Sequence, residues 1–129
     1  ILPFIEDKSA TLGRVLFYDK SLSANENMSC GSCHLQSHSF ADNKVKSVGV
    51  TQPTKRNSMQ LNDLGWSNNS SFFWDKHKKD ILTAVELPLK DENEVGATLE
   101  DMLFKIGQSS FYPQLFECRK MNCIDKYHR

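Results

Sequence analysis

The sequence predicts an all-α fold made of short helices joined by long loops. Apolar residues recur at helical spacing in several separate stretches, and no stretch alternates apolar and polar residues as a half-buried strand would. Residues 34–60 are rich in Ser, Asn, Gly, Thr and Lys without any period, which indicates a long loop. The 129 residues and 14.8 kDa correspond to about one domain.

The first expected helix begins near the amino-terminal end. Ser9 can act as its N-cap, and apolar residues follow one helical turn apart at Leu12, Val15 and Leu16. Residues 19–27 are mostly polar turn formers and lead into the cysteine motif described below.

The second half of the chain predicts three more helices, each with a start or stop signal. Asp80 begins a helix that Pro88 should end, because proline lacks the N–H group that the helical ladder needs. Thr98 opens a capping-box pattern for the next helix, and Gly107 is expected to end it. Pro113 suits the first turn of a last helix.

The composition excludes several classes of partner. Sixteen Lys and Arg balance sixteen Asp and Glu, so the chain lacks the positive field of a nucleic-acid-binding protein or a polybasic membrane anchor. No apolar run approaches the roughly 18 residues of a membrane-spanning helix. We therefore expect a small folded domain with no nucleic-acid partner and no membrane span.

The cysteines point to a specific chemistry. Cys30 and Cys33 belong to the run Cys30-Gly31-Ser32-Cys33-His34, which is the haem-attachment pattern of c-type cytochromes. On one helical turn both thiols can reach the vinyl groups of the same haem, and His34 is then placed under the iron as its proximal ligand. We expect one covalently attached haem c with His34 as the iron ligand.

A bare pair of cysteines at this spacing also occurs in zinc sites and in redox disulfides. The other pair, Cys118 and Cys123, is too distant and too loosely spaced to complete a convincing zinc site. A thioredoxin-like motif needs a preceding strand, whereas residues 25–29 are turn-like. Haem attachment takes place outside the bacterial cytoplasm, so we expect a periplasmic protein. There Cys118 and Cys123 can form a disulfide, stay as thiols or pair outside this chain.

Several short motifs occur in a characteristic order around the haem motif. They are Leu12–Asp19, Leu22-Ser23, Phe40-Ala41-Asp42, Ser47-Val48-Gly49, Arg56-Asn57-Ser58, Phe72-Phe73-Trp74, Pro88-Leu89, Glu94 and Tyr112–Phe116. Together they cover roughly residues 9–117 and resemble the amino-terminal, peroxidatic haem domain of bacterial dihaem cytochrome c peroxidases and their MauG-type relatives. The resemblance implies one cytochrome-c-like haem domain over residues 1–129, with residues 118–129 unplaced.

The resemblance also implies roles for single residues. Glu94 matches the distal acid that handles the proton of bound hydrogen peroxide, although its acidic neighbours alone would indicate a solvated turn. Trp74 matches a tryptophan that assists electron transfer between two haems, where composition alone would make it a core aromatic. Pro88 matches a distal-pocket proline. Arg56 and Asn57 are expected to order their loop, with Arg56 near a haem propionate and solvent exposure of Arg56 as the alternative.

The chain departs from the family pattern at Val50, Ala84 and Met59, and also at Lys76-His77, where Gly-Arg is usual. Val50 stands where many members carry a histidine that ligates the resting haem, so that ligand switch is absent and the distal site is expected to be open. Ala84 stands where a glutamine is usual, which removes a hydrogen-bond donor to peroxide. Met59 stands where proline is frequent, and its thioether and the ring of His38 are the alternative sixth ligands of the iron.

Two functions follow. A peroxidase-like enzyme would reduce hydrogen peroxide opposite His34, use Glu94 as acid and base, and receive electrons near Trp74. The donor would be a small cytochrome or a cupredoxin, or a second haem-bearing domain or chain. A non-catalytic electron carrier, or the haem subunit of a larger assembly, would instead fill the distal face with Met59 or His38. The missing histidine and the retained Glu94 favour the peroxidase, whereas the missing glutamine and the single haem motif favour the carrier.

Overall fold

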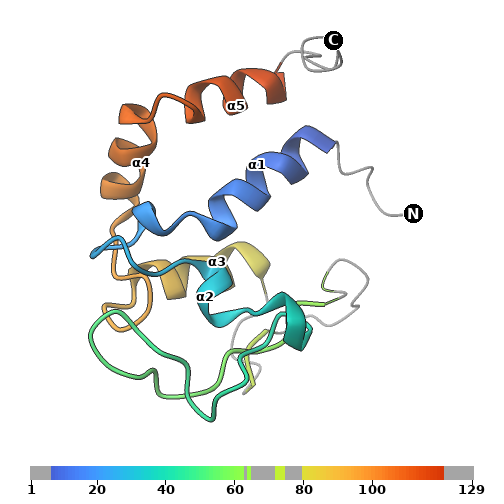
Figure 1. The fold of residues 1–129 in the computed structure, drawn as a ribbon, viewed down its shortest axis with the longest axis vertical. Coiled ribbons are helices and arrows are strands. Elements are labelled where there is room, and N and C mark those ends of the chain that lie inside the picture. The colour runs from blue at the N-terminus through green and yellow to red at the C-terminus, as the bar shows by residue number, and fades with distance from the viewer. Residues whose placement is uncertain (1–6, 63, 65–71, 75–79, 121–129) are drawn as a thin grey trace.

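The computed structural model describes residues 7–62, 64, 72–74 and 80–120, and this part of the chain is helical (Figure 1). The elements are α1 (Asp7–Tyr18), η1 (Lys20–Leu22), α2 (Cys30–Cys33), η2 (Gln36–His38), α3 (Ile81–Lys90), α4 (Leu99–Gln108) and α5 (Tyr112–Lys120). The described residues form no strand, and an isolated β-bridge joins Leu35 to Ala41. The predicted all-α class with short helices and long loops is confirmed.

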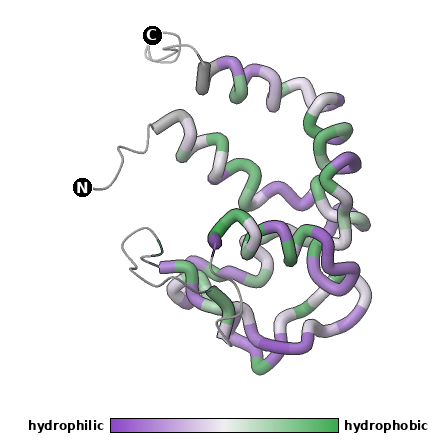
Figure 2. The backbone as a smooth tube through the Cα atoms, turned by 180° about the vertical axis from the view of Figure 1, so that it is seen from behind, coloured by the Kyte–Doolittle hydropathy of each residue, from purple (hydrophilic) through white to green (hydrophobic). Residues whose placement is uncertain are grey.

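The core lies where the helices near the two ends of the chain meet. Helix α5 runs alongside α1 (Figure 1). Helix α4 contacts both α5 and η1. The buried centre consists of Leu12, Leu22 and Tyr112, and partly buried Val15, Leu16, Met102, Ile106, Leu115 and Phe116 pack around it. The loop after α2 lies on the other side of the molecule and is mainly hydrophilic (Figure 2). None of the helices in the described ranges has the length and apolarity that crossing a membrane requires.

Two predicted helix boundaries are wrong. Helix α1 begins at Asp7, so Ser9 lies inside its first turn, where a serine is less favourable than alanine by well under about 1 kcal/mol, too little to stop the helix. Helix α3 continues through Pro88 to Lys90. Proline removes a single N–H from the ladder near the helix end, and the Asp91 N–H still donates to the carbonyl of Leu87 at 3.0 Å.

The other predicted boundaries agree with the structure to within a residue. The Asp80 carboxylate caps α3 by accepting the N–H of Thr83 at 2.8 Å. The Thr98 hydroxyl caps α4 by accepting the N–H of Asp101 at 3.1 Å. Helix α4 ends at Gln108, one residue beyond Gly107, and Pro113 lies in the first turn of α5.

A hydrogen-bond network around the buried Ser47 fixes the conformation of the long loop. Ser47 is 1% exposed, and its hydroxyl lies 2.8 Å from that of Ser58 and accepts the Ser58 N–H at 3.1 Å. Thr54 donates its N–H to the Ser47 carbonyl at 2.8 Å and its hydroxyl to the Arg56 carbonyl at 2.7 Å. These bonds hold residues 54–58 against Ser47 in the middle of the loop.

Candidate haem site

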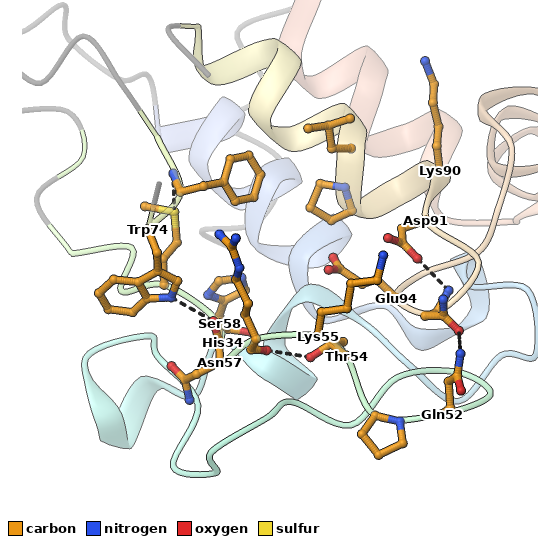
Figure 3. Close-up of a pocket in the computed structure, with 17 residues that line it drawn as sticks. His34, Gln52, Thr54, Lys55, Asn57, Ser58, Trp74, Lys90, Asp91 and Glu94 are labelled. Atoms are coloured by element: carbon orange, nitrogen blue, oxygen red, sulfur yellow. Dashed lines mark hydrogen bonds between the residues drawn. The ribbon is translucent and has the colours of Figure 1, made fainter. Parts of the chain in front are cut away.

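A cavity of about 660 Å³ lies between the loop and the end of α3, within the size range of cofactor sites. Its walls come from residues 52–59, from Phe73 and Trp74, from the end of α3 with the turn that follows, and from His34. In Figure 3, Trp74 lies at one end and Gln52 at the other, with His34 between them.

His34 follows directly on α2, and Ser29 and Ser32 cap the start of this short helix. The Ser32 hydroxyl accepts the N–H of Ser29 at 3.0 Å, and the His34 N–H donates to the Cys30 carbonyl at 2.9 Å. The ring Nδ1 of His34 lies 2.9 Å from the carbonyl oxygen of Phe40. Because a carbonyl only accepts, Nδ1 carries the proton and Nε2 keeps its lone pair, as a metal-binding histidine requires.

The carbonyl that orients His34 depends on an uncommon backbone conformation. Ser39 and Phe40 both have φ of 57°, in the left-handed region. The surrounding turn is closed by the Phe40 N–H donating to Leu35 at 2.8 Å and by the Ala41 N–H donating to His38 at 3.0 Å. The loop therefore imposes the tautomer of His34 through its backbone.

The two cysteines of α2 are unbridged thiols. Burial raises the pKa of both Cys30 and Cys33, and for Cys33 the charges of Asp42 and Glu94 raise it further. Within the described residues, no group of three or more His, Cys, Asp or Glu is arranged to hold a metal ion directly. His34 lines the cavity, whereas the two thiols are not among its lining residues and lie on the helical turn directly before His34. Two neighbouring thiols followed by an imidazole with a free Nε2 are a donor set that fits a c-type haem.

Glu94 lies on the turn after α3 and lines the same cavity as His34. Its N–H donates to the Asp91 carbonyl at 2.9 Å, which closes the turn. Burial raises the pKa of Glu94, and the negative charge of Asp91 raises it further. A half-buried carboxyl of this kind holds its proton to a higher pH than an exposed glutamate.

Trp74 lies at the rim of the cavity and is not a core residue, since 62% of its surface is exposed. Its Nε1–H donates to the carbonyl of Asn57 at 2.9 Å (Figure 3). Next to it, the sulfur of Met59 accepts the N–H of Phe73 at 3.3 Å. Trp74 thus contacts both the cavity and the solvent.

Most of the side chains that the sequence singled out line this one cavity: His34, Arg56, Met59, Trp74, Pro88 and Glu94. His38 does not; it is exposed, and its ring nitrogen lies 2.9 Å from the Ser37 hydroxyl. Val50 is half-buried beside the Glu94 turn, and Ala84 is buried in α3. The possible Cys118–Cys123 pair lies outside the side chains that the structure describes.

Sequence reasoning missed several residues of the cavity wall. Lys55 and Lys90 line the cavity, and Asn93 joins its walls. Asn57, which the sequence predicts to order its loop, does so with an amide that donates to the carbonyls of Asp42 and Lys44, whereas its backbone carbonyl accepts from Trp74. Contacts of this kind have no local sequence signal.

Comparisons with known proteins identify the family of the chain. The profile of the family described as di-haem cytochrome c peroxidase matches residues 7–120. The cytochrome c551 peroxidase of Nitrosomonas europaea is 34% identical over 98 residues, which cover 70% of this chain and 27% of that protein. The methylamine utilization protein MauG of Methylorubrum extorquens is 26% identical over 115 residues, which cover 88% of this chain and 32% of that protein.

Solved structures give the same result. A MauG-like protein associated with microbial copper homeostasis superposes with a TM-score of 0.78 at 31% identity, over 93% of this chain and 36% of that one. The diheme peroxidase BthA from Burkholderia thailandensis shares the fold, with a TM-score of 0.77 at 21% identity over 92% of this chain and 33% of that one. The chain spans about a third of the length of the curated relatives it matches. By its profile match over residues 7–120, the chain belongs to the di-haem cytochrome c peroxidase family.

Proposed function

We propose that this chain is the c-type haem domain of a periplasmic, peroxidase-like protein that reduces hydrogen peroxide. The supporting observation is that His34, with Nδ1 held by a carbonyl, and Glu94, with a raised pKa, line one cavity. The electrons would come from a small cytochrome or a cupredoxin, or from a second haem-bearing domain or chain.

The residues that would hold the haem come from three parts of the chain. Cys30 and Cys33 would form the thioethers, and His34 would ligate the iron through Nε2. Arg56 offers a cation for a propionate, and Pro88 offers an apolar wall. When bound, the haem supplies an iron centre that binds peroxide and exchanges electrons.

Glu94 would move the proton that the reduction requires. Reduction of one hydrogen peroxide to two waters consumes two electrons and two protons. The Glu94 carboxylate would take a proton from the incoming peroxide and return it to the oxygen that leaves as water. Its raised pKa suits both steps, because the protonated and ionised forms are then closer in free energy near neutral pH. Trp74, which contacts both cavity and solvent, would lie on the electron path.

A non-catalytic electron carrier is the second candidate. The observation in its favour is that Met59 lines the cavity and has a thioether that can ligate iron. Against it, the Met59 sulfur already accepts the N–H of Phe73 at 3.3 Å. We therefore favour the peroxidase.

The ferric absorption and EPR spectra of the haem-loaded protein separate the two functions. A high-spin spectrum that changes within seconds of adding one equivalent of hydrogen peroxide is expected for an open distal site. A low-spin spectrum indifferent to peroxide would show that a sixth protein ligand is present, and the electron carrier would replace the peroxidase.

Glu94→Gln tests the proposed proton transfer. The amide keeps the size of the side chain but cannot exchange a proton, so we expect the peroxide reaction to slow by roughly 10²- to 10⁴-fold with haem attachment unchanged. Glu92→Gln is the matched control, because Glu92 is an exposed acid two residues away that does not line the cavity. An unchanged rate in Glu94→Gln would remove Glu94 from the mechanism.

A further inference from the structure

Residues 49–53 form a loop beside the Glu94 turn, and this loop is attached mainly to Asn93. The Val50 N–H donates to the Asn93 carbonyl at 3.2 Å. The Thr51 hydroxyl and the Gln52 amide both donate to the Asn93 side-chain oxygen, at 3.1 and 2.9 Å. The backbone carbonyl and the side-chain oxygen of Asn93 thus accept hydrogen bonds from three successive residues of the loop.

The close approach of the two segments also depends on Gly49. A Cβ at this position would collide with the carbonyl oxygens of Asn93 and Gln52. Among the described residues, one other hydrogen bond joins residues 49–53 to the rest of the chain. In it, the Asn25 side-chain amide donates to the Val50 carbonyl at 3.2 Å. The loop therefore has few anchors besides Asn93.

Asn93 itself is held firmly by α3. Its N–H donates to the Asp91 carboxylate at 2.8 Å, a bond drawn dashed in Figure 3. The N–H of Val95 donates to the Pro88 carbonyl at 3.1 Å, so the turn folds back onto the end of α3. The end of α3 thus fixes the turn that contains Asn93, and this turn fixes residues 49–53.

The loop is also a wall of the cavity, since Gln52 and Pro53 line it together with Glu94. We propose that Asn93 is a positioning residue that clamps the 49–53 loop as the wall beside Glu94 and keeps water from its carboxyl group. The clamp is a property of the fold, and its effect on peroxide chemistry rests on the proposed function.

Other charged groups around Glu94 must be considered before a titration is interpreted. Cys33 ends α2 and His34 follows it, Lys55 and Arg56 come from the segment after the loop, and Lys90 and Asp91 lie where α3 ends. Asn93→Ala alters none of these charges. A change in the titration of Glu94 in that variant would therefore report changed burial.

Hydrogen exchange of the haem-loaded protein, followed by mass spectrometry, tests the clamp without reference to activity. We expect the amides of residues 49–54 to exchange about tenfold faster in Asn93→Ala, with α4 unchanged. Gly49→Ala should give the same pattern because it separates the same segments sterically. Thr51→Val removes one of the bonds and should give a smaller increase, which keeps the test valid if Asn93→Ala folds poorly.

The matched control is Asn43→Ala, which removes an exposed asparagine elsewhere in the long loop. Asn43 makes no side-chain hydrogen bond within the described part of the chain, so its exchange pattern should equal that of the parent protein. Unchanged exchange of residues 49–54 in both Asn93→Ala and Gly49→Ala would overturn the clamp.

The pH dependence of the peroxide reaction tests the effect on Glu94. Its midpoint should fall in Asn93→Ala, because loss of burial lowers the pKa of Glu94. It should rise in Asn93→Asp, because a carboxylate still accepts both side-chain bonds but adds a negative charge nearby. Midpoints that stay constant, or that move in the same direction, would overturn the positioning role. If the peroxide reaction of Glu94→Gln is as fast as that of the parent protein, the proposed role of Glu94 fails. Hydrogen exchange still tests whether Asn93 holds the loop.

Discussion

Single hydrogen bonds decide the chemical state of individual side chains in this protein. The Phe40 carbonyl determines which nitrogen of His34 is free, at 2.9 Å. The hydroxyl of Tyr112, a residue 1% exposed, donates to the Asp19 carboxylate at 2.6 Å and so joins α5 to the end of α1. Burial raises the pKa of Tyr112 above its ordinary value, and the bond to Asp19 raises it further. For Asp19, burial raises the pKa, but hydrogen bonds from Ser21 and Tyr112 outweigh it and hold the pKa below its ordinary value.

Tyr112→Phe should therefore destabilise the fold in a pH-dependent way. At pH 7 we expect the free energy of unfolding to fall by about 1.5 kcal/mol, the low end for a bond to a charged group, because the bond is partly exposed to solvent. The contribution of Asp19 is present above its unfolded pKa and is lost as pH falls through the lower folded one. The contribution of Tyr112 is lost as pH rises past about 10, where the unfolded tyrosine ionises.

Urea denaturation of the haem-loaded proteins at pH 3, 7 and 10.5 measures this dependence. The difference between parent and variant should be largest at pH 7. Tyr18→Phe is the control, because Tyr18 is 45% exposed on α1. A difference that is the same at all three pH values would assign the effect to packing.

At the scale of elements, α4 connects the core to the segment before the haem motif. Met102 and Ile106 pack against the buried centre. The Lys105 ammonium group donates to the carbonyls of Ser21 and Ser23, at 2.8 Å each, and so ties α4 to η1. The N-cap at Thr98 sets where this helix begins.

Thr98→Ala should lower the free energy of unfolding by about 1 kcal/mol, because the N–H of Asp101 loses its acceptor. Thr98→Ser keeps a hydroxyl at the N-cap and should recover most of that loss. Urea denaturation compares the three proteins, and the absorption spectrum of the haem should be the same in all of them. Equal destabilisation by alanine and serine would show that the cap contributes nothing.

At the scale of the whole molecule, the helical core is small and the cavity is large. The buried hydrophobic residues of the described part are Leu12, Leu22, Met28, Ala84, Ala97 and Tyr112. The 660 Å³ cavity is lined by the end of α3 and the polar loop, and no residue of α1 or α5 is among its lining residues. Filling this cavity would join the loop to the helices, so a group bound there should stabilise the folded state strongly.

Removing the haem should therefore lower the stability of the protein, and the loop should be affected more than α1 and α5. In a Cys30→Ala, Cys33→Ala double variant, which cannot attach haem, we expect the melting temperature to fall by more than ~10 °C. Exchange of the loop amides at residues 42–58 should increase more than that of α1 and α5. Circular dichroism and hydrogen exchange measure both effects, and an unchanged melting temperature would contradict the fit of haem to this cavity.

The sequence by itself determined the features that local signals encode. The haem motif, the caps at Asp80 and Thr98 and the proline of α5 each depend on residues a few positions apart. The ordered motifs also led to the family, which the profile match confirms. Local signals were insufficient at Ser9 and Pro88, because a helix tolerates one unfavourable residue when the surrounding structure supports it.

Only the tertiary structure decided which residues meet. Glu94 and His34 line one cavity although 60 positions separate them, and Asn93 binds Thr51 and Gln52 across 42 and 41 positions. Trp74 proved to be a rim residue, with 62% of its surface exposed, rather than a core aromatic. Such contacts depend on how the loop folds around Ser47 and attaches to the turn after α3, and hydrogen bonds between distant backbone groups leave no pattern in the sequence.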